Sequence, residues 1–160
     1  MNNDEDQEAV KNMKTHFPFL FDRGFRVTYT HFDEESFGNW IVVLGSPEFS
    51  VMLIQDRSEL WLSIGSGQRY SNQGRWVGLE LLIYFLTNEK DYIASYDGDL
   101  HDQTKQYQRL AETFVTYYDQ IFDVIVSDFD KNYYSIMSLK SKIFELSQKE
   151  VLERMRKTGA

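Results

Sequence analysis

The fold is decided by residues 40–64, which read WIVVLGSPEFSVMLIQDRSELWLSI. Two polar breaks, at residues 45–48 and 56–58, divide this stretch into three runs that are rich in strand-forming residues. Each break is short enough to be a tight turn between neighbouring strands. The stretch therefore predicts three consecutive antiparallel strands.

A fourth strand is expected just before this stretch. Phe25, Val27, Tyr29 and His31 alternate with polar residues, and this period of two is typical of a strand with one buried face. A polar turn at residues 33–39 separates it from the next strand. Four successive strands joined by short turns favour an antiparallel meander.

Helices are expected on both sides of the meander. The helical spacing of apolar residues predicts helices over residues 4–15, 76–85, 107–125 and 132–156, with an interruption at 127–130. Residues 16–18 (His-Phe-Pro) end the first helix, because the residue before a proline is disfavoured in the α conformation. We therefore expect one α+β domain over residues 1–160: an N-terminal helix, a four-stranded antiparallel meander, and three helices packed on the sheet.

Composition excludes several classes of function. The chain has no cysteine, so it has no disulfide scaffold, thiolate metal site or cysteine nucleophile. Its net charge of -8 opposes binding to phosphate backbones, so nucleic acid is not an expected partner. A basic protein is a candidate partner, and a charge that only keeps the protein in solution is the more common explanation. The acidic N-terminus lacks signal-peptide features, and the apolar segment 77–86 is too short to cross a bilayer. We expect a cytoplasmic, soluble protein without membrane association.

The best candidate for chemistry is the segment around Asp97, Asp99, His101 and Asp102, whose oxygen atoms suit a hard cation. The spacing does not match a calcium loop, because Asp102 and Gln108 occupy the places that require glycine and glutamate. We interpret residues 97–99 as a turn and Asp102 as the N-terminal cap of the following helix. No metal or other cofactor is expected.

Other motifs are missing or incomplete. The loop at residues 65–74 contains glycines but matches neither nucleotide-binding pattern, and it follows a meander rather than opening a βαβ unit. His16, His31 and His101 lie far apart, and no nucleophile elbow surrounds a serine. We therefore nominate no catalytic residue and interpret the loop as a connection.

One family resemblance follows from three segments of the chain. They are FPFLFDRGF at residues 17–25, the Asp56–Arg57 turn into ELWL at residues 59–62, and the helix that contains Trp76, Leu79 and Leu82. Together they resemble small bacterial α+β proteins that are similar to the immunity proteins of polymorphic toxin systems, over roughly the first 90 residues. The resemblance implies a compact acidic protein that neutralises a toxin by binding it and needs no catalytic residues.

The first functional interpretation is accordingly a non-enzymatic binding protein with a basic partner. Its candidate contact residues are acidic and form one negative face if the fold brings them near each other: Asp33, Glu34, Glu35, Asp97, Asp99 and Asp102.

Two alternatives stay open. One is a small ligand-binding domain or enzyme that uses a pocket between the sheet and the helices, with Asp97, Asp99 and His101 as its polar cluster. The other is a homodimer formed through the C-terminal helices, because the apolar stripe of the last helix must be covered.

Overall fold

The structure is a computed structural model that describes residues 3–67, 74–91 and 102–159. Helices precede and follow an antiparallel sheet, so the expected α+β class is confirmed. In chain order the elements are α1 (Asn3–His16), α2 (Pro18–Asp22), β1 (Arg26–Asp33), β2 (Asn39–Gly45), β3 (Phe49–Asp56), β4 (Glu59–Ser66), β5 (Trp76–Gly78), α3 (Leu79–Leu86), α4 (Gln103–Met137) and α5 (Lys140–Thr158).

The strands form one sheet in which the order in space follows the order in the chain, from β1 to β5. The expected meander is therefore present, but the described sheet has five strands instead of four. The additional strand is β5, which pairs with Ser63, Ile64 and Gly65 of β4. Residues 76–78 are as apolar as the helix that follows them, and a three-residue strand is too short to show its own period. The predicted helix therefore begins at Leu79 and not at Trp76.

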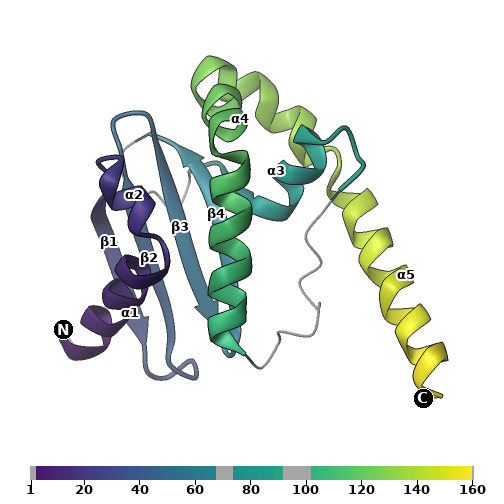
Figure 1. Ribbon diagram of the computed structural model, residues 1–160, viewed down its shortest axis with the longest axis horizontal. Coiled ribbons are helices and arrows are strands. Elements are labelled where there is room, and N and C mark those ends of the chain that lie inside the picture. Colours follow the sequence, from purple (N-terminus) through teal and green to yellow (C-terminus); the bar gives the residue numbers. More distant parts are fainter. Residues whose placement is uncertain (1–2, 68–73, 92–101, 160) are drawn as a thin grey trace.

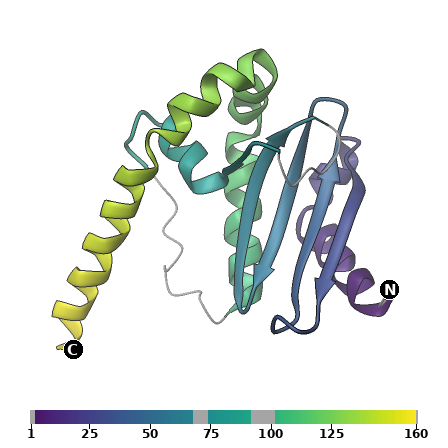
Figure 2. The same cartoon turned by 180° about the vertical axis from the view of Figure 1, so that it is seen from behind.

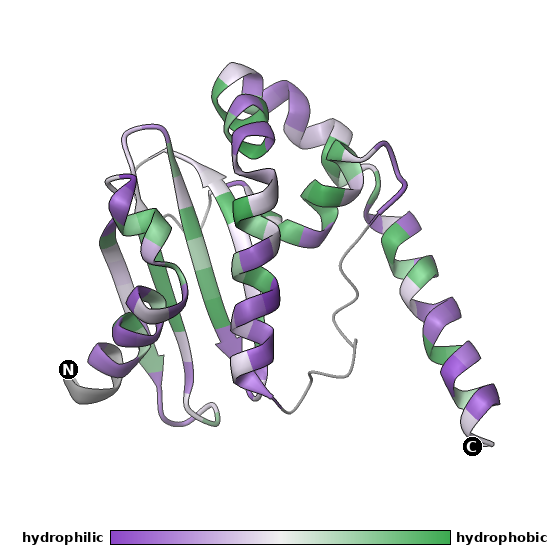
Figure 3. Cartoon of the chain, viewed as in Figure 1, coloured by the Kyte–Doolittle hydropathy of each residue, from purple (hydrophilic) through white to green (hydrophobic). Residues whose placement is uncertain are grey.

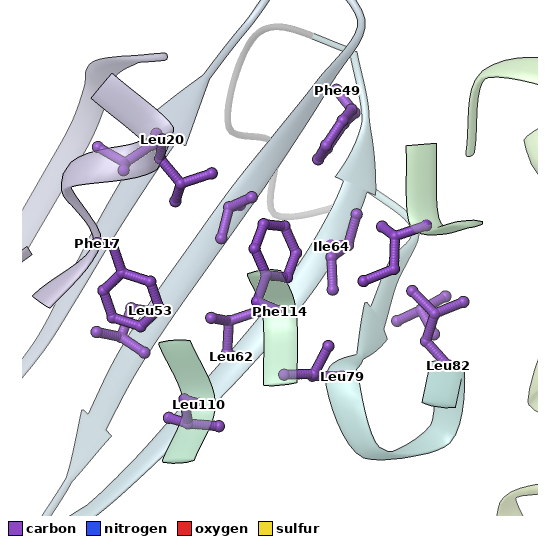
Figure 4. Close-up of a cluster of buried hydrophobic side chains, with 14 of the residues drawn as sticks. Phe17, Leu20, Phe49, Leu53, Leu62, Ile64, Leu79, Leu82, Leu110 and Phe114 are labelled. Carbon is purple, nitrogen blue, oxygen red and sulfur yellow. The ribbon is translucent and has the colours of Figure 1, made fainter. Parts of the chain in front are cut away.

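One face of the sheet is covered by helices, with α1 and α2 lying over β1 and β2 and α4 lying over β4 (Figure 1). The core lies between these two layers, and Figure 4 shows part of it. Phe17, Phe114, Leu53 and Leu62 all belong to this buried cluster. Burial of such side chains contributes about 1.5–3 kcal/mol each, so the contact between the layers is the main source of stability.

The other face of the sheet is not covered by any described helix, as the view from behind shows (Figure 2). On this face the strand register places His31, Ile41, Ile54 and Trp61 in one row across four strands. Trp76 lies over Gly65, its partner in the register, at one side of the same face.

The C-terminal helices differ from the expectation. The predicted interruption is confirmed as a kink inside α4, where Asp128 has a non-helical backbone (φ -161, ψ 75). The last helix begins at Lys140, later than predicted, and none of its described residues is buried. It stands away from the sheet (Figure 1), so the expectation that it packs there is wrong. The reason is that only the start of the helix reaches the core, through the partly buried Ile143 and Leu146, whereas Met155 near its end is exposed.

Candidate functional sites

Three segments meet at one end of the sheet: the β1–β2 turn, the β3–β4 turn and the start of α4. The side chain of Asn39 joins the two turns, because its Nδ2 donates to Oδ1 of Asp56 (3.0 Å) and its Oδ1 accepts from the backbone N–H of Arg57 (2.6 Å). Nε2 of Gln103 in α4 donates to Oε1 of Gln55 in β3 (2.7 Å). These hydrogen bonds connect the turns to one another and the sheet to the helix.

The predicted residues Asp33, Glu34 and Glu35 lie in the first of these turns. Oδ1 of Asp33 accepts hydrogen bonds from the backbone N–H groups of Glu35 and Ser36, each at 3.1 Å. The hydrogen bonds from Ser36 hold the pKa of Asp33 below its ordinary value, so this carboxylate is charged at neutral pH. Glu34 and Glu35 are exposed to solvent.

Asp102 lies at the start of α4, where its Oδ1 accepts a hydrogen bond from the backbone N–H of Lys105 (3.1 Å). The prediction that Asp102 caps this helix is therefore confirmed. Its other carboxylate oxygen is 3.9 Å from Nζ of Lys105. Asp97, Asp99 and His101 lie outside the described residues, as does most of the glycine-containing loop.

The fold thus brings the first acidic turn and Asp102 to one end of the molecule, and it adds Asp56 and Glu59 from the β3–β4 turn. The sequence reasoning missed these two residues, although alternate turns of an antiparallel meander are expected to lie at the same end of the sheet. Arg57 and Lys105 are the basic side chains of the same segments, against six carboxylates. The guanidinium of Arg57 lies 5.5 Å from the centre of the Phe37 ring. We call this region, with its carboxylates Asp33, Glu34, Glu35, Asp56, Glu59 and Asp102, the acidic end.

A pocket of about 280 Å³ lies beside β4, where this strand extends past its short pairing with β5. Its walls come from β4, β5, α3, α4 and the first turn of α5. Most of the lining is apolar, and it includes the indole rings of Trp61 and Trp76. Pockets with an apolar lining and a few polar groups are typical sites for small ligands.

Glu80 contributes a carboxylate to this pocket from the first turn of α3. Burial raises the pKa of Glu80 to about 7, the guanidinium of Arg109 opposes this rise, and the carboxylate of Glu59 adds to it. The remaining charged residue of the lining is Lys140, which is exposed. The sequence reasoning assigned no role to Glu80, although a single carboxylate in the apolar run LELLIYFL is the signal that points to it.

Within residues 3–67, 74–91 and 102–159, no group of three or more histidine, cysteine, aspartate or glutamate side chains is placed to hold a metal ion. Among the same residues, no helix has both the length and the apolar character needed to cross a membrane.

Comparisons of the chain with protein-family models, with curated proteins and with solved structures find no match.

Proposed function

We propose that the protein is a non-enzymatic interaction protein that binds a basic protein, in the way that an immunity protein binds its toxin. The acidic end is the observation that supports this proposal, because turns and a helix start from three parts of the chain place six carboxylates there. Complementary charge of this kind steers a basic partner and speeds its association.

The hydrogen bonds at the acidic end add to this argument. Asp33 and Asp102 are held by backbone N–H groups, and Asp56 is held by Asn39. A partner therefore meets charges whose positions are already set, which lowers the entropic cost of binding.

The test compares capture of proteins from the source-cell lysate by the wild type and by the triple variant Glu34→Gln, Glu35→Gln, Glu59→Gln. These changes remove three charges and leave the capping carboxylates Asp33 and Asp102 in place. The proposal predicts a basic partner that the wild type releases at high salt and that the triple variant captures at least about tenfold less well. The matched control carries Glu145→Gln, Glu150→Gln and Glu153→Gln on α5 and retains the partner. Equal capture by both triple variants would contradict the proposal.

A second candidate function, self-association through α5, is supported by a different observation. Phe144, Val151, Leu152 and Met155 of this helix are large and exposed, with Phe144 at 65% and Leu152 at 54% of full exposure. Figure 3 shows that hydrophobic and hydrophilic positions are interspersed along the projecting helix. Phe144, Val151 and Met155 are spaced by seven and four residues, so they share one face.

Light scattering tests this second candidate. A homodimer has twice the 19.0 kDa mass of the chain. The expected result is a dimer for the wild type, a monomer for Val151→Glu, which places a charge in the apolar face, and a dimer for the control Glu153→Gln on the opposite side of the helix. A monomeric wild type at high protein concentration would rule this candidate out.

A further inference from the structure

We propose that the pocket beside β4 binds a small ligand that has an apolar body and a protonated amine, with the amine paired to Glu80 and the apolar body against Trp61 and Trp76. The pocket adjoins the acidic end, since Glu59 of that end acts on Glu80, but the inference does not depend on the proposed protein partner.

The apolar part of the ligand is inferred from the walls of the pocket. Leucine side chains of β4, α3 and α4 and the two indoles form most of its lining. A volume of about 280 Å³ matches one small organic group and not a peptide or a nucleotide.

The charge of the ligand is inferred from the acidic groups. Glu80 lines the pocket, and no hydrogen bond or ion pair of its carboxylate is found within the described part of the chain. Glu59 lies close enough to oppose ionisation of Glu80. Leaving a partly buried carboxylate without a direct partner is costly, and a ligand ammonium removes this cost by forming a charge-assisted hydrogen bond.

The basic groups around Glu80 do not fully compensate the cost of burying its charge. Arg109 of α4 favours the charged form of Glu80, but its effect is smaller than the effect of burial. Lys140 belongs to the lining and lies on the exposed first turn of α5. The proposal therefore predicts that an amine, and not an acid, is the preferred ligand.

The experiment titrates the full-length protein with 2-phenylethylamine, and with 2-phenylethanol and 3-phenylpropanoate as neutral and anionic analogues of similar shape. At pH 8 the amine should bind at least about tenfold more tightly than either analogue. Between pH 8 and pH 6 its affinity should fall about tenfold, since Glu80 takes up a proton over this range while the amine stays protonated. The Glu80→Gln variant should lose both the preference and the pH dependence, whereas Glu153→Gln should keep them.

The indole N–H resonances locate the ligand in the wild type, so the test stands even where Glu80→Gln fails to fold. Trp61 and Trp76 line the pocket, whereas Trp40 lies in the core and is 7% exposed. The amine should shift the resonances of Trp61 and Trp76 and leave that of Trp40 in place. Equal binding of the alcohol, tighter binding of the acid, or no shift at Trp61 and Trp76 would each overturn the proposal.

Discussion

The contact between Gly65 and Trp76 shows how a single residue shapes the edge of the sheet. A Cβ atom added to Gly65 would lie 2.8 Å from Cε3 of Trp76, closer than carbon atoms approach in folded proteins. The indole therefore lies flat on the strand only because residue 65 has no side chain. This contact helps to place Trp76 as part of the pocket wall.

We expect Gly65→Ala to lower the free energy of unfolding by about 1–3 kcal/mol, because the added methyl group overpacks the site and displaces the indole. Urea denaturation monitored by tryptophan fluorescence measures this loss. The matched control is Gly78→Ala, since a Cβ at Gly78 meets no atom within 4 Å. Equal effects of the two substitutions would show that close packing at Trp76 is not the cause.

Glu80 makes the stability of the protein depend on pH. Its folded-state pKa of about 7 lies above the ordinary value of 4.5, so in the range between them the folded chain keeps a proton that the unfolded chain has lost. The resulting contribution to stability is fully present below pH 4.5 and is lost as the pH rises through 7.

From pH 5 to pH 8 the wild type is therefore expected to lose about 2–3 kcal/mol more than Glu80→Gln, which does not titrate. Urea denaturation of both proteins at the two pH values gives this difference directly. Glu153→Gln, on exposed α5, should follow the wild type. Parallel behaviour of the wild type and Glu80→Gln would show that the carboxylate of Glu80 titrates normally.

At the scale of the elements, Gln106 of α4 joins that helix to the outer edge of β4. Its Oε1 accepts from the backbone N–H of Leu60 (2.8 Å), and its Nε2 donates to the carbonyl of Ser58 (2.9 Å). Gln106 is 2% exposed, and its hydrogen bond with Leu60 is buried, whereas its hydrogen bond with Ser58 is partly buried. The side chain thus provides the pair of hydrogen bonds that a further strand would otherwise provide.

Replacing Gln106 with Leu keeps the side-chain volume and removes both hydrogen bonds. We expect a loss of about 1–3 kcal/mol in the free energy of unfolding, because the buried N–H of Leu60 and the partly buried carbonyl of Ser58 lose their partner. Thermal and urea denaturation measure it. Gln103→Leu is the control, since the hydrogen bond of Gln103 to Gln55 is exposed and contributes little.

The kink in α4 is stabilised by two hydrogen bonds from side chains at and after it. Oδ1 of Asp128 accepts from the backbone N–H of Lys131 (3.2 Å), and Nδ2 of Asn132 donates to the carbonyl of Val124 (3.0 Å). We expect Asp128→Ala to lower the free energy of unfolding by about 1 kcal/mol, because it removes this cap. The control Asp123→Ala, an exposed change before the kink, should lower it by less than about 0.5 kcal/mol. Chemical denaturation distinguishes the two, and an equal effect would show that Asp128 does not act as a cap.

Strand β1 shows why local patterns mislead at this scale. The register shifts between Val27 and Tyr29, which is a β-bulge at Thr28. Phe25 is buried and Phe32 packs against the core, although they differ by an odd number of residues and would otherwise lie on opposite faces. The alternation from Phe25 to His31 therefore predicted the strand correctly and its buried face only in part.

At the scale of the whole molecule, α5 is the helix that is least packed against the rest of the protein, since none of its described residues is buried. Ile143 and Leu146 are partly buried against the core, and Lys142 pairs with Glu89 (2.9 Å), while residues 151–159 are exposed. We expect a chain that ends at Leu139 to fold cooperatively and to lose only about 2 kcal/mol, since two half-buried aliphatic side chains are removed. Circular dichroism during urea denaturation tests this expectation, and loss of the cooperative transition would contradict it.

The candidate sites were predictable to different degrees. The sequence identified Asp33, Glu34, Glu35 and Asp102 as acidic residues in turns and caps, since such residues have strong local preferences. Their gathering with Asp56 and Glu59 depends on which ends of the strands meet the start of α4. The pocket around Glu80 depends on five elements at once, so no local pattern marks it.

Local sequence patterns were enough to predict the antiparallel meander, the capped start of α4 and the position of its kink, because turns, caps and hydrophobic period act over a few neighbouring residues. Long-range packing set four further features: the pairing of β5, the outward position of α5, the bulge-shifted face of β1 and the burial of Glu80. Each of these depends on contacts between segments that are distant in the chain. The free energy of such contacts is set by packing, and packing does not follow from the order of residues within one segment.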